Sequence, residues 1–172
     1  MKINLKHIVA AIALACASGS AIAEQVKNIL PYGACEQGKL GWYVWSKAGS
    51  IELETDRNGL GSGKGLKIIA QGDAVNASVS MPFNYQGRAT ISALVECDTI
   101  DTTKVVLQCF NYEGQQIAWI DLAHLNNDGR VTQIKKTVTI PDGSHKVNLA
   151  LIFSSPGTLR IDDIVVTPAP VE

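Results

Sequence analysis

The stretch that decides the fold is KVNLALIFSSPGTLRIDDIVVT, residues 146–167. Two apolar runs of strand length flank the turn sequence Ser155-Pro-Gly157, in which proline ends a strand and glycine allows a positive φ. In the first run, apolar residues alternate with a more polar set, as side chains do on the two faces of a β-strand. The apolar set is Val147, Leu149, Leu151 and Phe153, and the opposite set is Asn148, Ala150 and Ile152. The run therefore predicts a strand with one packed face and one half-polar face.

The same pattern recurs along the chain after residue 24. Apolar and polar residues also alternate in 75–81 and 89–97, and turn sequences such as Asn126-Asn-Asp-Gly129 separate the runs. We expect strands near residues 25–30, 42–46, 50–55, 65–71, 75–82, 89–97, 104–112, 115–122, 131–140, 146–154 and 158–167. Short, evenly spaced strands of this kind predict an all-β fold, a two-sheet antiparallel β-sandwich.

The N-terminus predicts export. Two lysines precede an uninterrupted apolar stretch, and Ala21-Ile-Ala23 supplies the small residues of a cleavage site. The apolar stretch is too short to span a bilayer. We therefore expect residues 1–23 to be a signal peptide and the protein to be periplasmic or secreted. The alternative is a lipoprotein acylated on Cys16, but Ala13 stands where a lipobox has a large aliphatic residue.

The remainder of the chain has the size of one domain. Residues 1–23 hold two of the 15 Lys and Arg and none of the 16 Asp and Glu, so the remaining 149 residues carry a net charge of −3. That length suffices for a single core, and we expect a domain over 24–167 and a tail over 168–172. A mildly acidic chain without a basic run argues against nucleic acid as a partner, and no further apolar segment is long enough for a membrane span.

Three cysteines follow the expected cleavage site, Cys35, Cys97 and Cys109, and an odd number leaves at least one thiol unpaired. If the strands holding Cys97 and Cys109 form a direct hairpin, the two lie about five residues out of register, beyond the reach of a disulfide. Strand parity instead predicts that both are small buried hydrophobic residues. The pairing of the three cysteines stays open.

The sequence contains no recognisable catalytic constellation. His124 and His145 are the histidines of the expected domain, neither is spaced for metal ligation, and there is no G-x-S-x-G motif. The glycine-rich stretch 59–65 leads into an expected strand and lacks the Ser or Thr that a phosphate-binding loop places after its lysine. We therefore predict a non-enzymatic protein. An enzyme would need two carboxylates that face each other across a cleft.

The tryptophans are candidates for a sugar-binding surface. Trp42 and Trp45 differ by three positions, so they point to opposite faces of a regular strand, and Trp119 lies within another expected strand. Indole rings stack on the C–H faces of sugar rings, while amides and hydroxyls bind the sugar hydroxyls. Most tryptophans of a sandwich belong to its core, so the exposure of Trp45 and Trp119 is open at this point.

The last expected strand carries two adjacent aspartates. The run from Leu159 to Val166 is apolar on both parities, so one of Asp162 and Asp163 must point into a covered layer. A buried carboxylate needs a cation or several hydrogen-bond donors. A Ca²⁺ site, a salt bridge and a strand-end position in water are the three interpretations that remain.

Four segments together resemble a known family. They are Asn28-Ile-Leu-Pro-Tyr-Gly-Ala-Cys-Glu36, Gly41-Trp42, Gly65-Leu-Lys-Ile68 and Leu159-Arg-Ile-Asp-Asp-Ile164. In order and separation they are similar to the CenC-type carbohydrate-binding modules of families 4 and 9, and the resemblance extends over nearly all of residues 26–167. It implies a galactose-binding-domain-like jelly roll of two antiparallel sheets.

The resemblance also implies a site for a polysaccharide or oligosaccharide. Its aromatic and polar positions fall on Trp45, Trp119, Ser80, Gln108 and Asn148. A structural Ca²⁺ would be held by the carboxylate of Asp162 and by backbone carbonyls at Ala34 and Lys64. The chain departs from the family in having Cys35 where a buried Phe is usual and Ile152 at a cleft position that is often polar.

The sequence thus predicts an exported, non-catalytic module that binds glycan by stacking aromatic rings on sugars. The alternative is an envelope structural or interaction domain that has lost sugar binding and holds a protein partner on the same sandwich. A grooved sheet with aromatic rings beside amides would favour sugar. A flat apolar patch of several hundred Å² would favour protein.

Overall fold

The structure is a computed structural model that describes residues 27–31, 33, 35, 37–61, 63–72, 77–99 and 103–170. The expected signal peptide, residues 1–23, lies outside the described residues. The described strands are β1 (Tyr43–Trp45), β2 (Ser50–Asp56), β3 (Gly65–Gln71), β4 (Ala77–Phe83), β5 (Gly87–Thr99), β6 (Thr103–Phe110), β7 (Gln116–Leu125), β8 (Val131–Ile140), β9 (Lys146–Phe153) and β10 (Gly157–Pro168). Within the described ranges, no helix has the length and apolarity needed to cross a bilayer.

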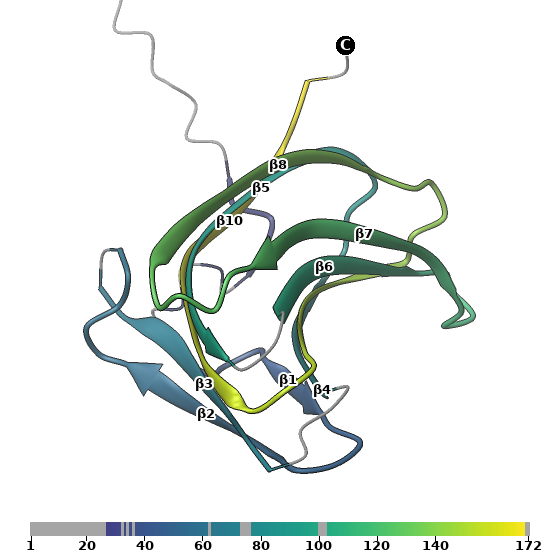
Figure 1. The fold of residues 1–172 in the computed structure, drawn as a ribbon. Helices are drawn as coiled ribbons and strands as arrows, with labels where there is room; N and C mark the ends of the chain where they lie inside the picture. Colours follow the sequence, from purple (N-terminus) through teal and green to yellow (C-terminus); the bar gives the residue numbers. More distant parts are fainter. Residues whose placement is uncertain are drawn as a thin grey trace, which may run out of the picture.

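The strands form two five-stranded antiparallel sheets that face each other (Figure 1). In sheet A the order is β1-β4-β9-β6-β7, and in sheet B it is β2-β3-β10-β5-β8. The chain changes sheet at several connections, so strands that follow one another in sequence often lie in opposite layers. The predicted all-β fold, a two-sheet antiparallel sandwich, is confirmed.

The core lies between the sheets and takes one face of each strand. On β9 the set that alternation predicted is buried, and Ala150 on the opposite face is buried as well; β4 and β5 follow the alternation. The buried apolar residues of these three strands are Ala77, Val79, Met81, Phe83, Ala89, Ile91, Ala93, Val95, Cys97, Val147, Leu149, Ala150, Leu151 and Phe153. Removing this apolar surface from water is the main favourable term in folding, at about 25 cal/mol per Å². The other face of each sheet is left partly open to solvent.

The three cysteines that the structure describes are buried, as parity predicted for Cys97 and Cys109. Cys97 lies on β5 in sheet B and Cys109 lies on β6 in sheet A. The two strands therefore do not form a direct hairpin. Cys35 is also buried, its Sγ donates to Gly33 O at 3.7 Å, and it adopts a positive φ of 59° just before the tight loop that leads to β1. Burial raises the pKa of the Cys109 thiol, although a hydrogen bond with Ser144 lowers it in part.

The prediction of a strand over residues 25–30 is wrong for the part that the structure describes, because residues 27–30 are not in a strand. Beyond Ile161 the neighbouring strand β3 has ended, and the N-terminal segment covers this free edge of β10 instead. Backbone and side-chain hydrogen bonds share the pairing. Ile29 N donates to Val166 O at 2.7 Å and Ile164 N donates to Gly33 O at 2.8 Å. The Asn28 side chain adds two more, since Nδ2 donates to Ile164 O at 2.8 Å and Val166 N donates to Oδ1 at 2.8 Å. Pro31 has no N–H for a ladder, so a regular strand cannot continue here.

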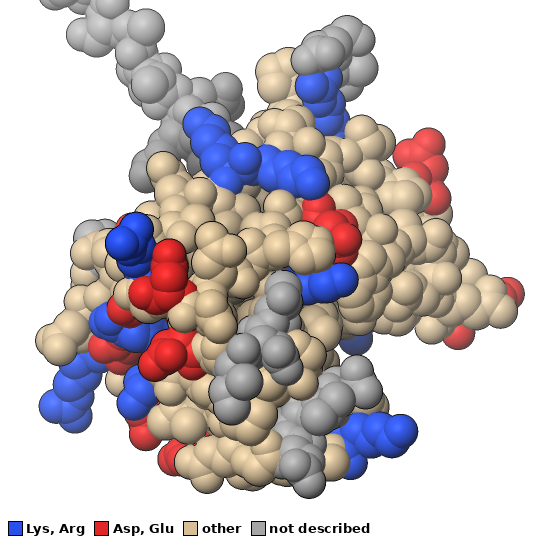
Figure 2. All heavy atoms as spheres, viewed as in Figure 1, with Lys and Arg blue, Asp and Glu red and all other residues tan. Residues whose placement is uncertain are grey.

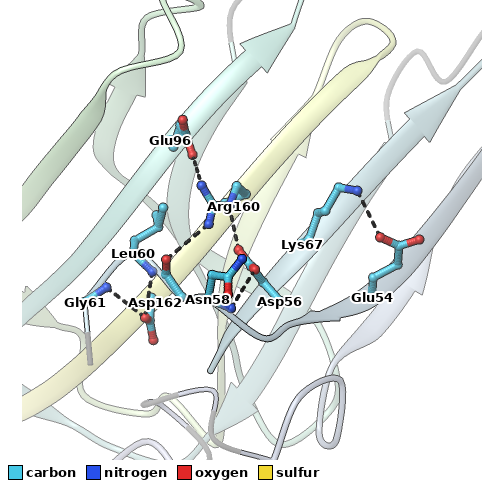
Figure 3. A network of polar contacts seen from close by, with 10 residues as sticks. Glu54, Asp56, Asn58, Leu60, Gly61, Lys67, Glu96, Arg160 and Asp162 are labelled. Atoms are coloured by element: carbon cyan, nitrogen blue, oxygen red, sulfur yellow. Dashed lines mark hydrogen bonds and ion pairs between the residues drawn. The ribbon is translucent and has the colours of Figure 1, made fainter. Parts of the chain in front are cut away.

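The outer face of sheet B carries a row of charged residues (Figure 3). Arg160 on β10 binds the carboxylates of Asp56 and Glu96, and Lys67 on β3 donates to Glu54 on β2 at 3.0 Å. Burial opposes the charge of Asp56, but hydrogen bonds from Arg160 and Asn58 N and the charge of Arg160 outweigh it and lower the pKa of Asp56. The network ties together four strands of one sheet.

Candidate functional site

Two exposed indoles stand on opposite edges of sheet A. Trp45 belongs to the edge strand β1 and is 57% exposed, and Trp119 belongs to the edge strand β7 and is 44% exposed. Trp42 is 7% exposed and packs in the core. The three-residue separation of Trp42 and Trp45 thus puts one ring inside and the other outside. Because the three other strands lie between β1 and β7, the outer face of the sheet separates the two exposed rings.

Polar side chains lie between the two rings in register. Gln108 on β6 pairs with Asn148 on β9 and with Trp119 on β7, so the three residues form one row across the sheet. Ser80 on β4 pairs with Ala150 in the next row. The Oδ1 atom of Asn148 is buried and has no hydrogen-bond partner among the described residues. A buried acceptor of this kind costs free energy unless something donates to it.

These residues line one groove with a volume of about 420 Å³. Its lining residues are Trp45, Ala77, Ser78, Ser80, Gln108, Trp119, Asn148 and Ile152. All five residues that the resemblance placed in a sugar site are therefore brought together, and Ile152 joins them. Sequence reasoning missed Ser78 and Ala77. The signal for Ser78 was its parity, which it shares with Ser80 on β4.

The indole of Trp119 is held by a neighbour on its own strand that sequence reasoning also missed. Trp119 Nε1 donates to Asp121 Oδ1 at 2.7 Å, because residues two apart on a strand share a face. The same carboxylate lies 3.7 Å from His124 Nε2, and Lys136 Nζ on β8 donates to the Asp121 carbonyl at 2.7 Å. The ring is thus oriented before any ligand arrives.

The groove is electrically neutral. Within the described part of the chain, no carboxylate and no cationic side chain lines it. Charged side chains gather on the side of β2 and β3 and along β8, and the surface toward the turn between β6 and β7 is largely uncharged (Figure 2). A groove with indoles, amides and hydroxyls suits an uncharged, hydroxyl-rich ligand.

The buried aspartate of the last strand is Asp162, as one of the two had to be. Its carboxylate is 0% exposed and accepts three backbone hydrogen bonds. Leu60 N and Gly61 N donate to Oδ2 at 3.0 Å each (Figure 3), and Asp163 N donates to Oδ1 at 2.7 Å. Arg160, two residues away, binds other carboxylates. Backbone donors therefore account for the burial of this carboxylate.

The expected Ca²⁺ site stays a prediction. Ala34 lies outside the described residues, and Lys64 directly precedes β3. A carboxylate and backbone carbonyls are the hard oxygen ligands that Ca²⁺ takes, so Asp162 and Lys64 are compatible with the ion. In the described part of the chain, no group of three or more His, Cys, Asp or Glu side chains could hold a metal by themselves.

No family model matches the sequence, and no curated protein matches it either. Solved structures do match, at low identity. A family 4 carbohydrate-binding module is 16% identical with a TM-score of 0.62, over 81% of this chain and 99% of the module. A family 22 module of Clostridium thermocellum is 13% identical with a TM-score of 0.61, over 81% of this chain and 94% of the module. A family 16 module matches similarly. The fold is therefore that of these carbohydrate-binding modules.

Larger proteins contain the same fold. The enzymatically active domain of tailspike protein 4 from bacteriophage CBA120 is 12% identical with a TM-score of 0.69, over 81% of this chain but 21% of the tailspike chain. A two-module piece of a Clostridium thermocellum endo-1,4-beta-D-xylanase, solved with xylohexaose, matches over 29% of its length. This chain thus spans less than a third of either of these proteins.

Proposed function

We propose that the chain is an exported, non-catalytic module that binds a glycan chain in the groove of sheet A. The observation that carries the proposal is the placement of two exposed indoles on opposite edges of a neutral groove with amides and hydroxyls between them. Trp45 and Trp119 stack on sugar rings, and the ligand is a polymer or oligomer, because four strand spacings of about 4.8 Å separate the two edge strands.

The polar residues between the rings select hydroxyl groups. Asn148 Oδ1 is a buried acceptor without a partner, and a sugar hydroxyl that donates to it would satisfy it. Gln108 stands beside Asn148 in the same row, and Ser80 adds a hydroxyl from β4. Ile152 and the buried Ala150 give an apolar floor for C–H groups.

The similar structures suggest a first ligand to try. Family 22 modules among them are named as xylan-binding domains, and one xylanase piece was solved with xylohexaose. Both observations describe the similar proteins and are the reason to try xylan first here. An uncharged xylan or β-glucan also agrees with the neutral lining of this groove.

Affinity electrophoresis tests the proposal. Wild type, Trp45→Ala and Trp119→Ala would be run in gels that contain soluble xylan, mixed-linkage β-glucan or galactomannan. We expect at least one polysaccharide to retard the wild type and each substitution to weaken binding about tenfold or more. Ile117→Ala is the matched control, since Ile117 is an exposed residue of β7 that does not line the groove. A wild type that no polysaccharide retards would overturn the proposal.

A protein partner is the second candidate, favoured by one observation. The edge strand β1 is short, and its side chains are all exposed, among them Tyr43 and Val44 beside Trp45. An exposed edge can pair with another chain. Light scattering of the purified protein separates the two candidates. The protein partner would be supported if the wild type self-associates, Val44→Lys abolishes this association, and no glycan binds.

A further inference from the structure

We propose that a second pocket, at the end of the sandwich beyond the groove, is an additional binding site for sugar units of the same glycan chain. This inference rests on the proposed function and extends it to a part of the molecule to which sequence reasoning assigned no role. The pocket has a volume of about 570 Å³ and is lined by Asn84, Tyr85, Gln86, Tyr112, Gly143, Ser144 and His145.

Three connections build the pocket. Asn84 to Gln86 join β4 to β5, Tyr112 lies in the turn between β6 and β7, and Gly143 to His145 lead into β9. Gln86 Nε2 donates to Ser144 O at 2.9 Å and joins the first connection to the third. The backbone N–H of His145 donates to the carbonyl of Phe110 at 2.8 Å, which fixes the start of β9 against the end of β6.

Tyr112 provides an open aromatic face in this pocket. It is 84% exposed, and His145 touches it edge-on, with ring centroids 5.0 Å apart and an interplanar angle of 69°. Its turn is closed by the pairing of Asn111 with Gln115: Asn111 N donates to Gln115 O at 2.9 Å, and Gln115 N donates to Asn111 Oδ1 at 2.9 Å. A large aromatic ring on a rigid turn, open to water, loses little conformational entropy when a sugar stacks on it.

The chemistry of the pocket repeats that of the groove. Among the described residues, its lining contains no Asp, Glu, Lys or Arg, and Asn84, Gln86 and Ser144 supply amide and hydroxyl groups around the aromatic rings. Figure 2 shows a largely uncharged surface toward the turn between β6 and β7. A neutral polyhydroxyl ligand fits this lining better than a phosphate or a carboxylate, which would need a cation.

The pocket lies on the same strands as the groove. Both β4 and β6 run through the groove and end at the pocket, and β9 begins there. His145 is three residues from Asn148, which corresponds to about 10 Å along a strand. Only one outward-facing row, in which Phe110 pairs with Lys146, separates the two sites. One extended glycan chain can therefore reach both sites. Binding in the groove raises the effective concentration of the chain's other sugar units at the pocket, and this second contact increases the affinity.

The test measures affinity against chain length for Tyr112→Ala. The probes are xylan and xylo-oligosaccharides of increasing length. If a different polysaccharide retards the wild type in affinity electrophoresis, the probes are that polysaccharide and its oligosaccharides. We expect short oligomers to bind the variant as they bind wild type and the polymer to bind it about threefold to tenfold more weakly. Tyr112→Phe keeps the ring and should keep the affinity. Glu113→Ala is the matched control, because Glu113 is exposed in the same turn and does not line the pocket.

The outcomes separate this inference from the proposed function. If Trp119→Ala loses binding but Tyr112→Ala matches wild type at every length, the groove is the whole site and the inference is overturned. An equal loss at all lengths would also overturn it, because an added contact must matter only for long chains. If neither tryptophan variant changes binding, the proposed function itself fails. Tyr112 is so exposed that its removal should leave the melting temperature unchanged, which calorimetry would verify.

Discussion

The hydrogen bond between Trp119 Nε1 and Asp121 shows how one residue can prepare a ring for stacking. An indole that is already oriented loses less freedom on binding. We predict that Asp121→Ala weakens glycan binding about twofold to fivefold, which corresponds to the loss of one largely exposed hydrogen bond. Asp121→Asn should bind like the wild type, because its amide oxygen still accepts the hydrogen bond from the indole. Titration with the retained polysaccharide, followed by tryptophan fluorescence, would measure both. Equal affinities for wild type and Asp121→Ala would contradict the role.

Asp162 poses a question about metal at the same scale. We predict that excess chelator lowers the melting temperature of the protein, because an ion that binds only the folded state adds its binding free energy to stability. In Asp162→Asn the chelator should cause no further decrease. An unchanged melting temperature of the wild type, with no metal found by elemental analysis, would contradict the prediction. The three backbone N–H donors would then be the complete explanation of this buried carboxylate.

At the scale of elements, the N-terminal segment pairs with β10 through both backbone and side-chain hydrogen bonds. Asn28 satisfies Ile164 O and Val166 N on β10, and removing it leaves both without a partner in a partly buried place. We predict that Asn28→Ala destabilises the fold by about 1–3 kcal/mol. Urea denaturation would measure the loss, with the exposed neighbour Lys27→Ala as control. A loss no larger than that of the control would show that the segment contributes nothing to the stability of β10.

Alternation predicted much of the fold, because a side-chain period of two records which face of a strand is buried. It placed Leu149 and Leu151 in the core and left Asn148 on the groove face. It could not decide which strands pair, so whether β5 and β6 form a hairpin stayed open, and the structure places them in different sheets. The resemblance brought Trp45 and Trp119 together across distant strands, which periodicity alone could not do.

The pocket around Tyr112 was beyond sequence reasoning for a physical reason. Its lining comes from three connections that are far apart in the chain, and connections have no periodicity to interpret. Asp121 was missed in a different way. It has the same parity as Trp119, so the pattern contained the signal, but parity shows that two side chains share a face and does not show that they are hydrogen-bonded.

Taken as a whole molecule, the sandwich divides its work between two outer faces. Sheet A offers a neutral groove, and sheet B carries the charged row of Arg160, Asp56 and Glu96. As a consequence, the stability of the fold and the affinity for glycan should depend differently on pH. The groove has no ionisable lining within the described residues, so its affinity should be nearly constant wherever the protein is folded, whereas the charged row should respond to acid.

The direction of that response follows from Asp56. Its pKa is lowered in the folded protein, so on acidification the unfolded chain takes up this proton first, and the stabilisation is lost as the pH falls through the lowered value. Above the ordinary pKa of an aspartate the contribution is complete and constant. We predict that urea midpoints of wild type and Asp56→Asn differ near neutral pH and converge in acid, while glycan affinity stays level as long as the fold persists. Parallel midpoint curves down to the lowest pH would show that Arg160 gains nothing from the Asp56 charge, and the network would then be held by Glu96 and the backbone carbonyl of Gly59.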